Sequence, residues 1–175
     1  MYYTDFKVDT VAGRVSFHDI SSKIKDALKA SNVKEGILVA ATPHTTCSLY
    51  YDETMHDTTY FGDELLQVDI SETRDKIAPR MTTEGQYHSP GPEHIAFGLS
   101  LGSKDYPAEK WTMLNTDAHL KASLYGGNSL TLIVHEGRLS TGSLGRVYFA
   151  DWDALRERTR QGKIMVMGER NRQLP

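Results

Sequence analysis

The sequence has little of what extracellular, membrane-spanning or nucleic-acid-binding proteins usually carry. It contains a single cysteine, Cys47, so no disulfide can form within the chain. No apolar run approaches the length of a membrane span, and the first ten residues lack the basic and apolar regions of a secretory signal. The formal charge is −3 and both signs are interspersed, which disfavours a nucleic acid or a membrane surface as partner but not a small anionic ligand. We therefore expect an intracellular, cytoplasmic protein.

The 175 residues are enough for one domain with its own core, and we expect a single domain over residues 1–175. The apolar patterns predict strands at 6–10 and 14–19 (a hairpin), 36–42, 46–51, 129–135, 138–140, 146–151 and 164–167. They predict helices at about 20–32, 54–66 and 115–125. Ser21 or Ser22 is the expected cap of the first helix, and Asn32 its expected end. This order favours an α+β fold of mostly antiparallel, sandwich-like strands with two or three helices.

Two stretches have a polar or irregular pattern. Residues 67–113 hold four prolines and four glycines, and we expect a loop-rich insertion that acts as a lid or is a flexible excursion. His88 and His94 lie in this insertion and could close over a site. Residues 156–161 are polar, which predicts a turn.

The first cluster of candidate functional residues follows the apolar run 36–42, which we expect to be a strand buried on both faces. It consists of His44, Thr45, Thr46 and Cys47. In a fully extended segment His44 and Cys47 would point to opposite faces, so a shared metal ion would require a turn or bulge there. The alternative is a buried cysteine beside a histidine that is hydrogen-bonded at a strand end.

The second cluster lies on the helix expected after Asn115 or Thr116. It consists of Asp117, His119, Lys121 and Ser123. The N-terminus of a helix disfavours imidazolium, so His119 would be neutral and suited to bind a metal or accept a proton, while Leu120 and Leu124 would enter the core. The alternative is that Asp117 complements the helix dipole and Lys121 is solvated. We expect the two clusters to meet in one site.

The two clusters, in this order, resemble the YjbQ-like family, also called the secondary thiamine-phosphate synthase family. The resemblance rests on residues 44–46 (HTT), residues 118–124 (AHLKASL) and the Gly137-Arg138-Leu139 hairpin, and covers about residues 5–66 and 113–168. It implies a small α+β domain that forms a homotrimer. It also implies a polar pocket near the subunit contacts whose histidines hold a metal or an anion. The matching positions are His44, Thr45, Thr46, His119 and Lys121, with Asp117 at a position that is often acidic or an amide.

Two functions are compatible with these residues. The first is a small-molecule enzyme, a transferase of the thiamine-phosphate synthase type that acts on phosphorylated substrates, with His44, His119 and Asp117 as catalytic groups. Thr45, Thr46, Lys121 and Ser123 would then bind the substrate or cofactor. The second is a non-catalytic trimeric module that binds a metal or a metabolite.

The same residues define the expected cofactor. His44, His119 and Cys47 are ligand types that favour Zn²⁺ over Mg²⁺, with Asp117 as an alternative third ligand. In a metal-free site, His44 and His119 would act as acid and base and Lys121 would hold a phosphate.

Overall fold

The computed structural model describes residues 1–103 and 107–170. The chain forms eight strands, four α-helices and one short 3₁₀ helix within these residues. In chain order they are β1 (Tyr2–Thr10), β2 (Ser16–Asp19), α1 (Ser21–Ser31), β3 (Val33–Ala41), β4 (Cys47–Glu53), α2 (Leu65–Ile77), α3 (Pro92–Leu101), η1 (Lys110–Met113), α4 (Thr116–Leu124), β5 (Ser129–His135), β6 (Arg138–Leu139), β7 (Gly145–Asp151) and β8 (Arg158–Arg170). All pairing between the strands is antiparallel, so the expected α+β class is confirmed.

Five strands form the larger sheet in the order β1-β8-β3-β5-β6. The longest of them, β8, pairs with β1 over residues 158–166 and with β3 over residues 163–170, so both neighbours pair with its middle. The turn expected at 156–161 is therefore wrong for residues 158–161. These residues belong to β8 and pair with β1; Arg160, for example, lies opposite Val8. The turn between β5 and β6 has positive φ at Glu136 (51°) and Gly137 (74°), which is typical of a tight hairpin.

Three strands form the smaller sheet in the order β2-β7-β4. The hairpin expected from residues 6–10 and 14–19 is therefore wrong, because β1 and β2 belong to different sheets. A single apolar core connects the two sheets and α1, and its fully buried members include Ile24, Leu38 and Phe149.

Helix α1 covers the inner face of the larger sheet. Asn32 ends it in the left-handed conformation with φ 54°, as expected. The expected serine cap is wrong: the Asp19 carboxylate accepts a hydrogen bond from the Ser21 backbone N–H at 2.8 Å. Ile20 and Ile24 are fully buried, so the helix attaches to the sheets through its apolar stripe.

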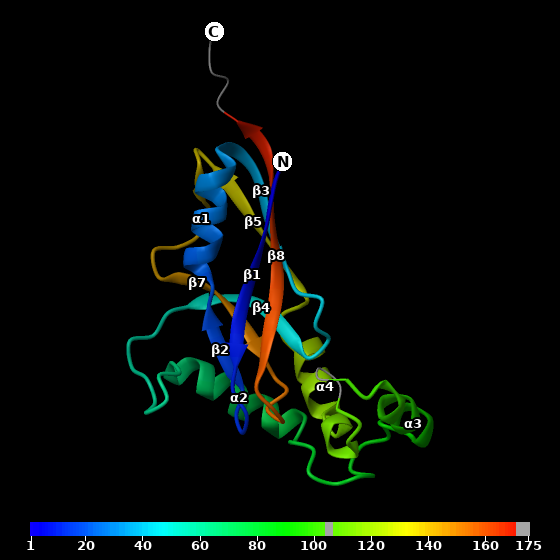
Figure 1. The fold of residues 1–175 in the computed structure, drawn as a ribbon. Helices are drawn as coiled ribbons and strands as arrows, with labels where there is room; N and C mark the ends of the chain where they lie inside the picture. The colour runs from blue at the N-terminus through cyan, green and yellow to red at the C-terminus, as the bar shows by residue number, and fades with distance from the viewer. Residues whose placement is uncertain (104–106, 171–175) are drawn as a thin grey trace.

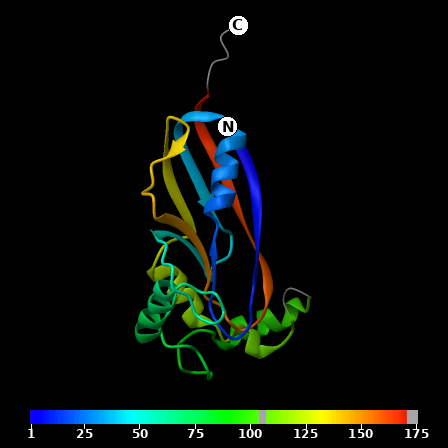
Figure 2. The same cartoon turned by 90° about the vertical axis from the view of Figure 1, so that its left-hand side faces the viewer.

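The chain between β4 and α4 differs most from expectation. The helix expected at 54–66 is absent, because the Glu64 carboxylate bonds back to the Thr54 hydroxyl and the Met55 N–H and holds this segment as a loop. Helix α2 begins after it and is anchored by Arg74, which is buried and stacks 3.7 Å above the Trp152 ring. Helix α3 also lies within the segment expected to be loop-rich. In Figures 1 and 2, α2, α3 and α4 gather at the end of the molecule opposite the N-terminus.

The outer face of the larger sheet is uncovered in the single chain. Ile37, Val39, Ile133, Met165 and Met167 are cross-strand neighbours on this face, here called the bare face. Ile37 is 37% exposed and Ile133 is 63% exposed. The expectation that residues 36–42 are buried on both faces is thus wrong for an isolated chain. Within the described residues, no helix combines the length and the apolar character needed to cross a bilayer.

Candidate functional site

A cavity of about 300 Å³ lies where the end of β3, the start of β8 and the helices α3 and α4 meet. We call it the histidine cavity. His44, His94 and His119 line it, together with Pro43, Thr45, Thr46, Phe97, Gly98, Leu101, Pro107, Thr112, Met113, Asn115, Asp153, Arg156, Arg158 and Arg160. The structure therefore brings His44 and His119, which are distant in the sequence, to the same cavity.

A turn at the end of β3 places His44. The Thr42 hydroxyl donates to the Gln161 carbonyl at 3.1 Å and accepts the His44 backbone N–H at 3.3 Å. The Cys47 N–H donates to the His44 carbonyl at 3.1 Å, which closes the turn before β4 begins. The extended conformation is thus interrupted between His44 and Cys47.

Both ring nitrogens of His44 face hydrogen-bond donors. Its Nε2 accepts the Gln161 backbone N–H at 3.1 Å, and its Nδ1 lies 3.3 Å from the Arg160 guanidinium. Burial lowers the pKa of His44, and Arg160 lowers it further. A neutral ring that accepts through Nε2 carries its proton on Nδ1. That proton would face the Arg160 guanidinium, which is also a donor, so a neutral ring accepts from only one of the two neighbours; the contacts fix the orientation of this histidine and not its tautomer.

Arg160 is the most strongly bonded cation of the cavity. Its guanidinium donates to both carboxylate oxygens of Asp151, at 2.8 and 3.2 Å, and to the Thr46 hydroxyl at 2.9 Å. Asp151 is 1% exposed and Arg160 8%. A two-pronged contact of this kind fixes the guanidinium plane, so Arg160 presents its remaining edge to His44 and the cavity.

His119 lies in the second turn of α4, at the mouth of the cavity. It is exposed to solvent, yet the surrounding protein desolvates the ring and lowers its pKa; Asp153 opposes this shift and His94 adds to it. The ring makes no hydrogen bond to another described residue. His119 is therefore neutral near pH 7 and keeps its nitrogens available to a ligand.

Asp153 is the carboxylate of the cavity. Burial alone would raise its pKa, but Arg158 at 2.9 Å, the Asn115 side chain and the Leu155 N–H together lower it. Asn115 was expected as a helix cap. It does precede α4, but its amide donates to Asp153 at 2.9 Å and makes no capping bond.

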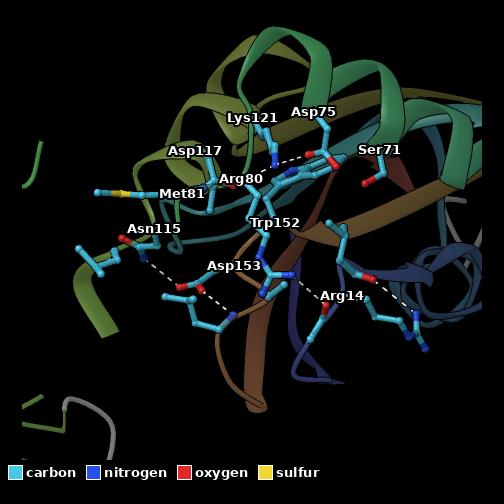
Figure 3. A pocket seen from close by; sticks show the side chains of 16 residues that line it. Arg14, Ser71, Asp75, Arg80, Met81, Asn115, Asp117, Lys121, Trp152 and Asp153 are labelled. Atoms are coloured by element: carbon cyan, nitrogen blue, oxygen red, sulfur yellow. Dashed lines mark hydrogen bonds and ion pairs between the residues drawn. The ribbon is translucent and has the colours of Figure 1, made fainter. Parts of the chain in front are cut away.

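A second cavity, of about 230 Å³, adjoins the first (Figure 3). Asn115 and Asp153 line both cavities, so their hydrogen bond forms a shared wall. Asp117 and Lys121 lie in this second cavity. Residues four apart share one face of a helix, whereas His119, two residues from each, points to another.

Lys121 is a buried cation between two carboxylates. Its ammonium lies 2.9 Å from Asp117 and 2.5 Å from Asp75 of α2. Asp117 also accepts the Met81 backbone N–H at 3.1 Å. Figure 3 shows Lys121 and Asp75 pointing toward each other. These contacts join α4 to α2 and to the segment that follows α2.

Other candidates lie away from the histidine cavity. Ser123 is exposed, and Cys47 is 2% exposed in the apolar core, where burial raises the pKa of its thiol. The expectation that Leu120 and Leu124 enter the core is wrong, since they are 39% and 52% exposed. The buried face of α4 instead carries Ala118 and Ala122.

The sequence analysis overlooked the arginines and Asp153. Arg158 and Arg160 are two apart on a strand and thus share a face, and the same spacing separates Asp151 and Asp153. Two aspartates and two arginines at the same spacing in neighbouring segments were the signal that could have identified these residues.

The donor set of one chain does not fit the expected zinc ion. Within the described residues, no three His, Cys, Asp or Glu side chains are grouped so that they could hold a metal. His44 presents one nitrogen to a backbone N–H and the other to a guanidinium, and the Cys47 thiol lies in the core. Arg160 would also repel a cation at this place. The arrangement suits an anion better.

Comparison with known proteins identifies the family to which the chain belongs. The family described as "UPF0047 protein YjbQ-like" matches residues 4–169. A UPF0047 protein of Archaeoglobus fulgidus is 29% identical over 84% of this chain and 89% of its own length, and one of Methanocaldococcus jannaschii is 28% identical over 84% and 83%.

Solved structures share the fold. An uncharacterised YjbQ/UPF0047 protein of Clostridium acetobutylicum superposes with a TM-score of 0.67 at 23% identity, covering 94% of this chain and 99% of that one. A hypothetical protein of Aeropyrum pernix K1 gives 0.68 at 24% identity, covering 97% and 100%. None of these descriptions names a substrate.

Proposed function

The chain belongs to the UPF0047 YjbQ-like family, and we propose that in this member the histidine cavity binds a small phosphorylated or otherwise anionic molecule. One observation supports this most directly: among the described residues that line the cavity, histidine side chains lie beside three guanidinium groups and one carboxylate, that of Asp153. Asp151, which lies behind Arg160, offsets part of that positive charge. Fixed guanidinium groups recognise phosphate and carboxylate through directed hydrogen bonds.

The helix that carries His119 adds to this preference. Asn115 precedes α4 and lines the cavity, so the first turn of the helix begins at its wall. Helix N-termini attract anions through their unpaired N–H groups and dipole. The Thr45 and Thr46 side chains lie in the same lining, where hydroxyl groups can donate to a ligand.

As an enzyme, the protein would be a transferase acting on phosphorylated small molecules. The reaction implied by the resemblance joins a pyrimidine diphosphate to a thiazole phosphate and releases pyrophosphate. In our proposal His119 is the acid–base group, because its ring is neutral and without a hydrogen bond to the described residues. A bound anion would raise the pKa of His119, so the ring could supply a proton to the leaving pyrophosphate.

In this proposal, Asp117 and Lys121 position the helix. Their ion pairs fix α4 against α2 and thereby set the place of His119. Ser123 is assigned no part, because its side chain is exposed and lies outside both cavities.

The second candidate is a binding module without turnover, assembled as a homotrimer. Two observations favour it. Donors face both ring nitrogens of His44, so its ring has no free lone pair with which to act as a general base. The bare face, with Ile37 and Ile133 exposed, offers a surface that other copies of the chain can cover.

Calorimetric titration with inorganic phosphate tests the binding. We expect saturable binding of one anion per chain, weakened about tenfold or more in the double variant His44→Gln/His119→Gln, which corresponds to about 1.4 kcal/mol. Ser123→Ala, on the same helix as His119 but outside the cavity, is the matched control. Absence of saturable binding to the wild-type protein, or equal binding by the double variant, would refute the proposal.

Turnover is tested separately. Thiamine-phosphate formation from the pyrimidine diphosphate and the thiazole phosphate should be lost in His119→Gln and kept in Ser123→Ala. Phosphate binding without turnover across a panel of such substrates would favour the binding module. Turnover that survives in His119→Gln would rule out its assignment as the acid–base group.

A further inference from the structure

The histidine cavity has two chemically different walls. One is polar and consists mainly of His44, Thr45 and Thr46 in the turn after β3, His119 of α4, and Arg158 and Arg160 at the start of β8. The other is apolar and comes from α3 and its surroundings, through Phe97, Leu101, Pro107 and Met113. An inorganic anion would use the polar wall and leave the apolar wall in contact with water.

The apolar wall is one face of a helix. His94, Phe97, Gly98 and Leu101 follow the spacing i, i+3, i+4 and i+7, which places them on a single side of α3. All four line the cavity. The face changes from polar at His94 to apolar at Leu101, so the helix contributes to both walls.

This wall is held in place. Gly98 lies against Met113 of the 3₁₀ helix η1, and a Cβ atom at Gly98 would be 2.1 Å from the Met113 sulfur. The missing side chain of Gly98 leaves room for the Met113 thioether, and α3 packs against η1 at this point. Met113 in turn lies two residues before Asn115 and three before the start of α4, so the apolar wall is attached to the helix that carries His119.

The apolar side chains of this wall are incompletely covered. Helix α3 has no buried residue, although most of its residues are apolar; Phe97 is 60% exposed and Leu101 is 42% exposed. A helix with this composition is normally covered by another apolar surface. At the cavity, the covering surface can be the ligand itself.

We propose that the ligand is an amphipathic anion, with a phosphate-type group on the polar wall and one flat apolar ring resting on Phe97 and Leu101. This inference rests on the proposed anion-binding function and specifies its substrate class. A cavity of about 300 Å³ is at the lower end of ligand sites, so it suits one ring with one anionic group rather than an extended molecule.

Two probes of the same charge test the ring. Phenyl phosphate and methyl phosphate differ in the apolar part alone, and we expect the wild-type protein to bind phenyl phosphate roughly tenfold more tightly in calorimetric titration, because the ring removes apolar area from water. Phe97→Ser and Leu101→Ser should reduce this ratio toward one while the affinity for methyl phosphate stays unchanged. Both side chains are exposed, so the folded state should persist, and circular dichroism checks it.

Leu99→Ser is the matched control. Leu99 is 40% exposed on α3 but does not line the cavity, so the ratio should remain at its wild-type value. Equal binding of the two probes by the wild-type protein would overturn the ring proposal and leave the anion site intact. Failure of both probes to bind would overturn the proposed function and this inference with it. An equal loss of the ratio in Leu99→Ser would also refute a specific role of the Phe97 wall.

Discussion

The side-chain amide of Asn115 donates a hydrogen bond to the carboxylate of Asp153 at 2.9 Å and so connects the residue before α4 to the segment between β7 and β8. Both residues line both cavities. The relative position of His119 and Arg158 therefore depends on this bond, since one follows Asn115 on its helix and the other pairs with Asp153.

Asn115→Leu should lower the free energy of unfolding by about 1–3 kcal/mol, because the buried Asp153 carboxylate loses one donor. The pKa of Asp153 should rise in the variant, because burial raises it and the Asn115 hydrogen bond, which lowers it, is lost. A carboxyl whose folded-state pKa is lowered stabilises the fold above its unfolded pKa and loses this effect as the pH falls through its folded pKa. In the variant the folded-state pKa of Asp153 lies closer to its unfolded value, so the difference in stability between the variant and the wild-type protein should narrow as the pH falls. Urea unfolding between pH 7 and pH 3 measures it, and Asn128→Leu, at an exposed site outside both cavities, should change little.

Lys121→Met should lower the free energy of unfolding by about 3 kcal/mol, because Asp117 would remain buried without its cation. Lys163→Met is the control: Lys163 is half exposed and pairs with Asp5 at 3.4 Å, so solvent screens the pair and its loss should destabilise the protein far less. Urea unfolding at pH 7 compares the two. Similar losses in both variants would contradict the positioning role assigned to Lys121.

Sulfate should bind more tightly as the pH falls from 8 toward 6, with proton uptake. The pKa values of His44 and His119 are lowered by burial, so both rings are neutral in the free protein, and a bound dianion raises these values. Sulfate itself does not titrate in this range. Titration in two buffers of different ionisation enthalpy counts the protons; a pH-independent affinity would contradict the assignment.

The stability of the ligand-free protein should depend on pH in the opposite direction. Below about pH 6.5 the histidines of the unfolded chain bind protons before those of the folded chain, so the free energy of unfolding declines as the pH falls toward the folded-state pKa values of His44 and His119.

Ile133→Glu should dissociate the proposed homotrimer into monomers. Ile133 is 63% exposed on the bare face and directly opposite Ile37, so a charge there opposes burial against another chain. Light scattering at micromolar concentration gives the mass. Tyr60→Glu, at a residue that is 98% exposed in a loop, should leave the assembly intact. A monomeric wild-type protein would refute the assembly itself.

Zinc should not bind tightly at one ion per chain, because the nitrogens of His44 face donors and Cys47 is in the core. Elemental analysis after dialysis against Zn²⁺ measures this. One retained ion per chain that is lost in His44→Ala, while folding is unchanged, would restore the zinc site expected from the sequence.

Local patterns predicted the elements whose residues alternate or repeat along the chain. The strand before His44, the strands near 129–135 and 138–140 and the helix after Asn115 are all in place, and His44 and His119 do share a cavity. The start of β8 was not predicted because its residues are polar and lack the apolar pattern of a strand. Arg160 is buried there only because it forms an ion pair with Asp151 of β7, a contact that the local sequence does not show. Helix α4 was placed correctly, yet its inward face was not, because Trp152 and its neighbours leave room for alanines and not for leucines.

Strand β8 carries three features at once. Its first residues include Arg158 and Arg160, two of the guanidinium groups of the histidine cavity. Its middle joins β1 to β3, and its second half presents Met165 and Met167 on the bare face. Any event that protects one part of a continuous hydrogen-bonded ladder also slows the opening of the rest. Amide hydrogen exchange along this one strand should therefore slow both when an anion is added and when chains associate, and the two effects should reinforce each other.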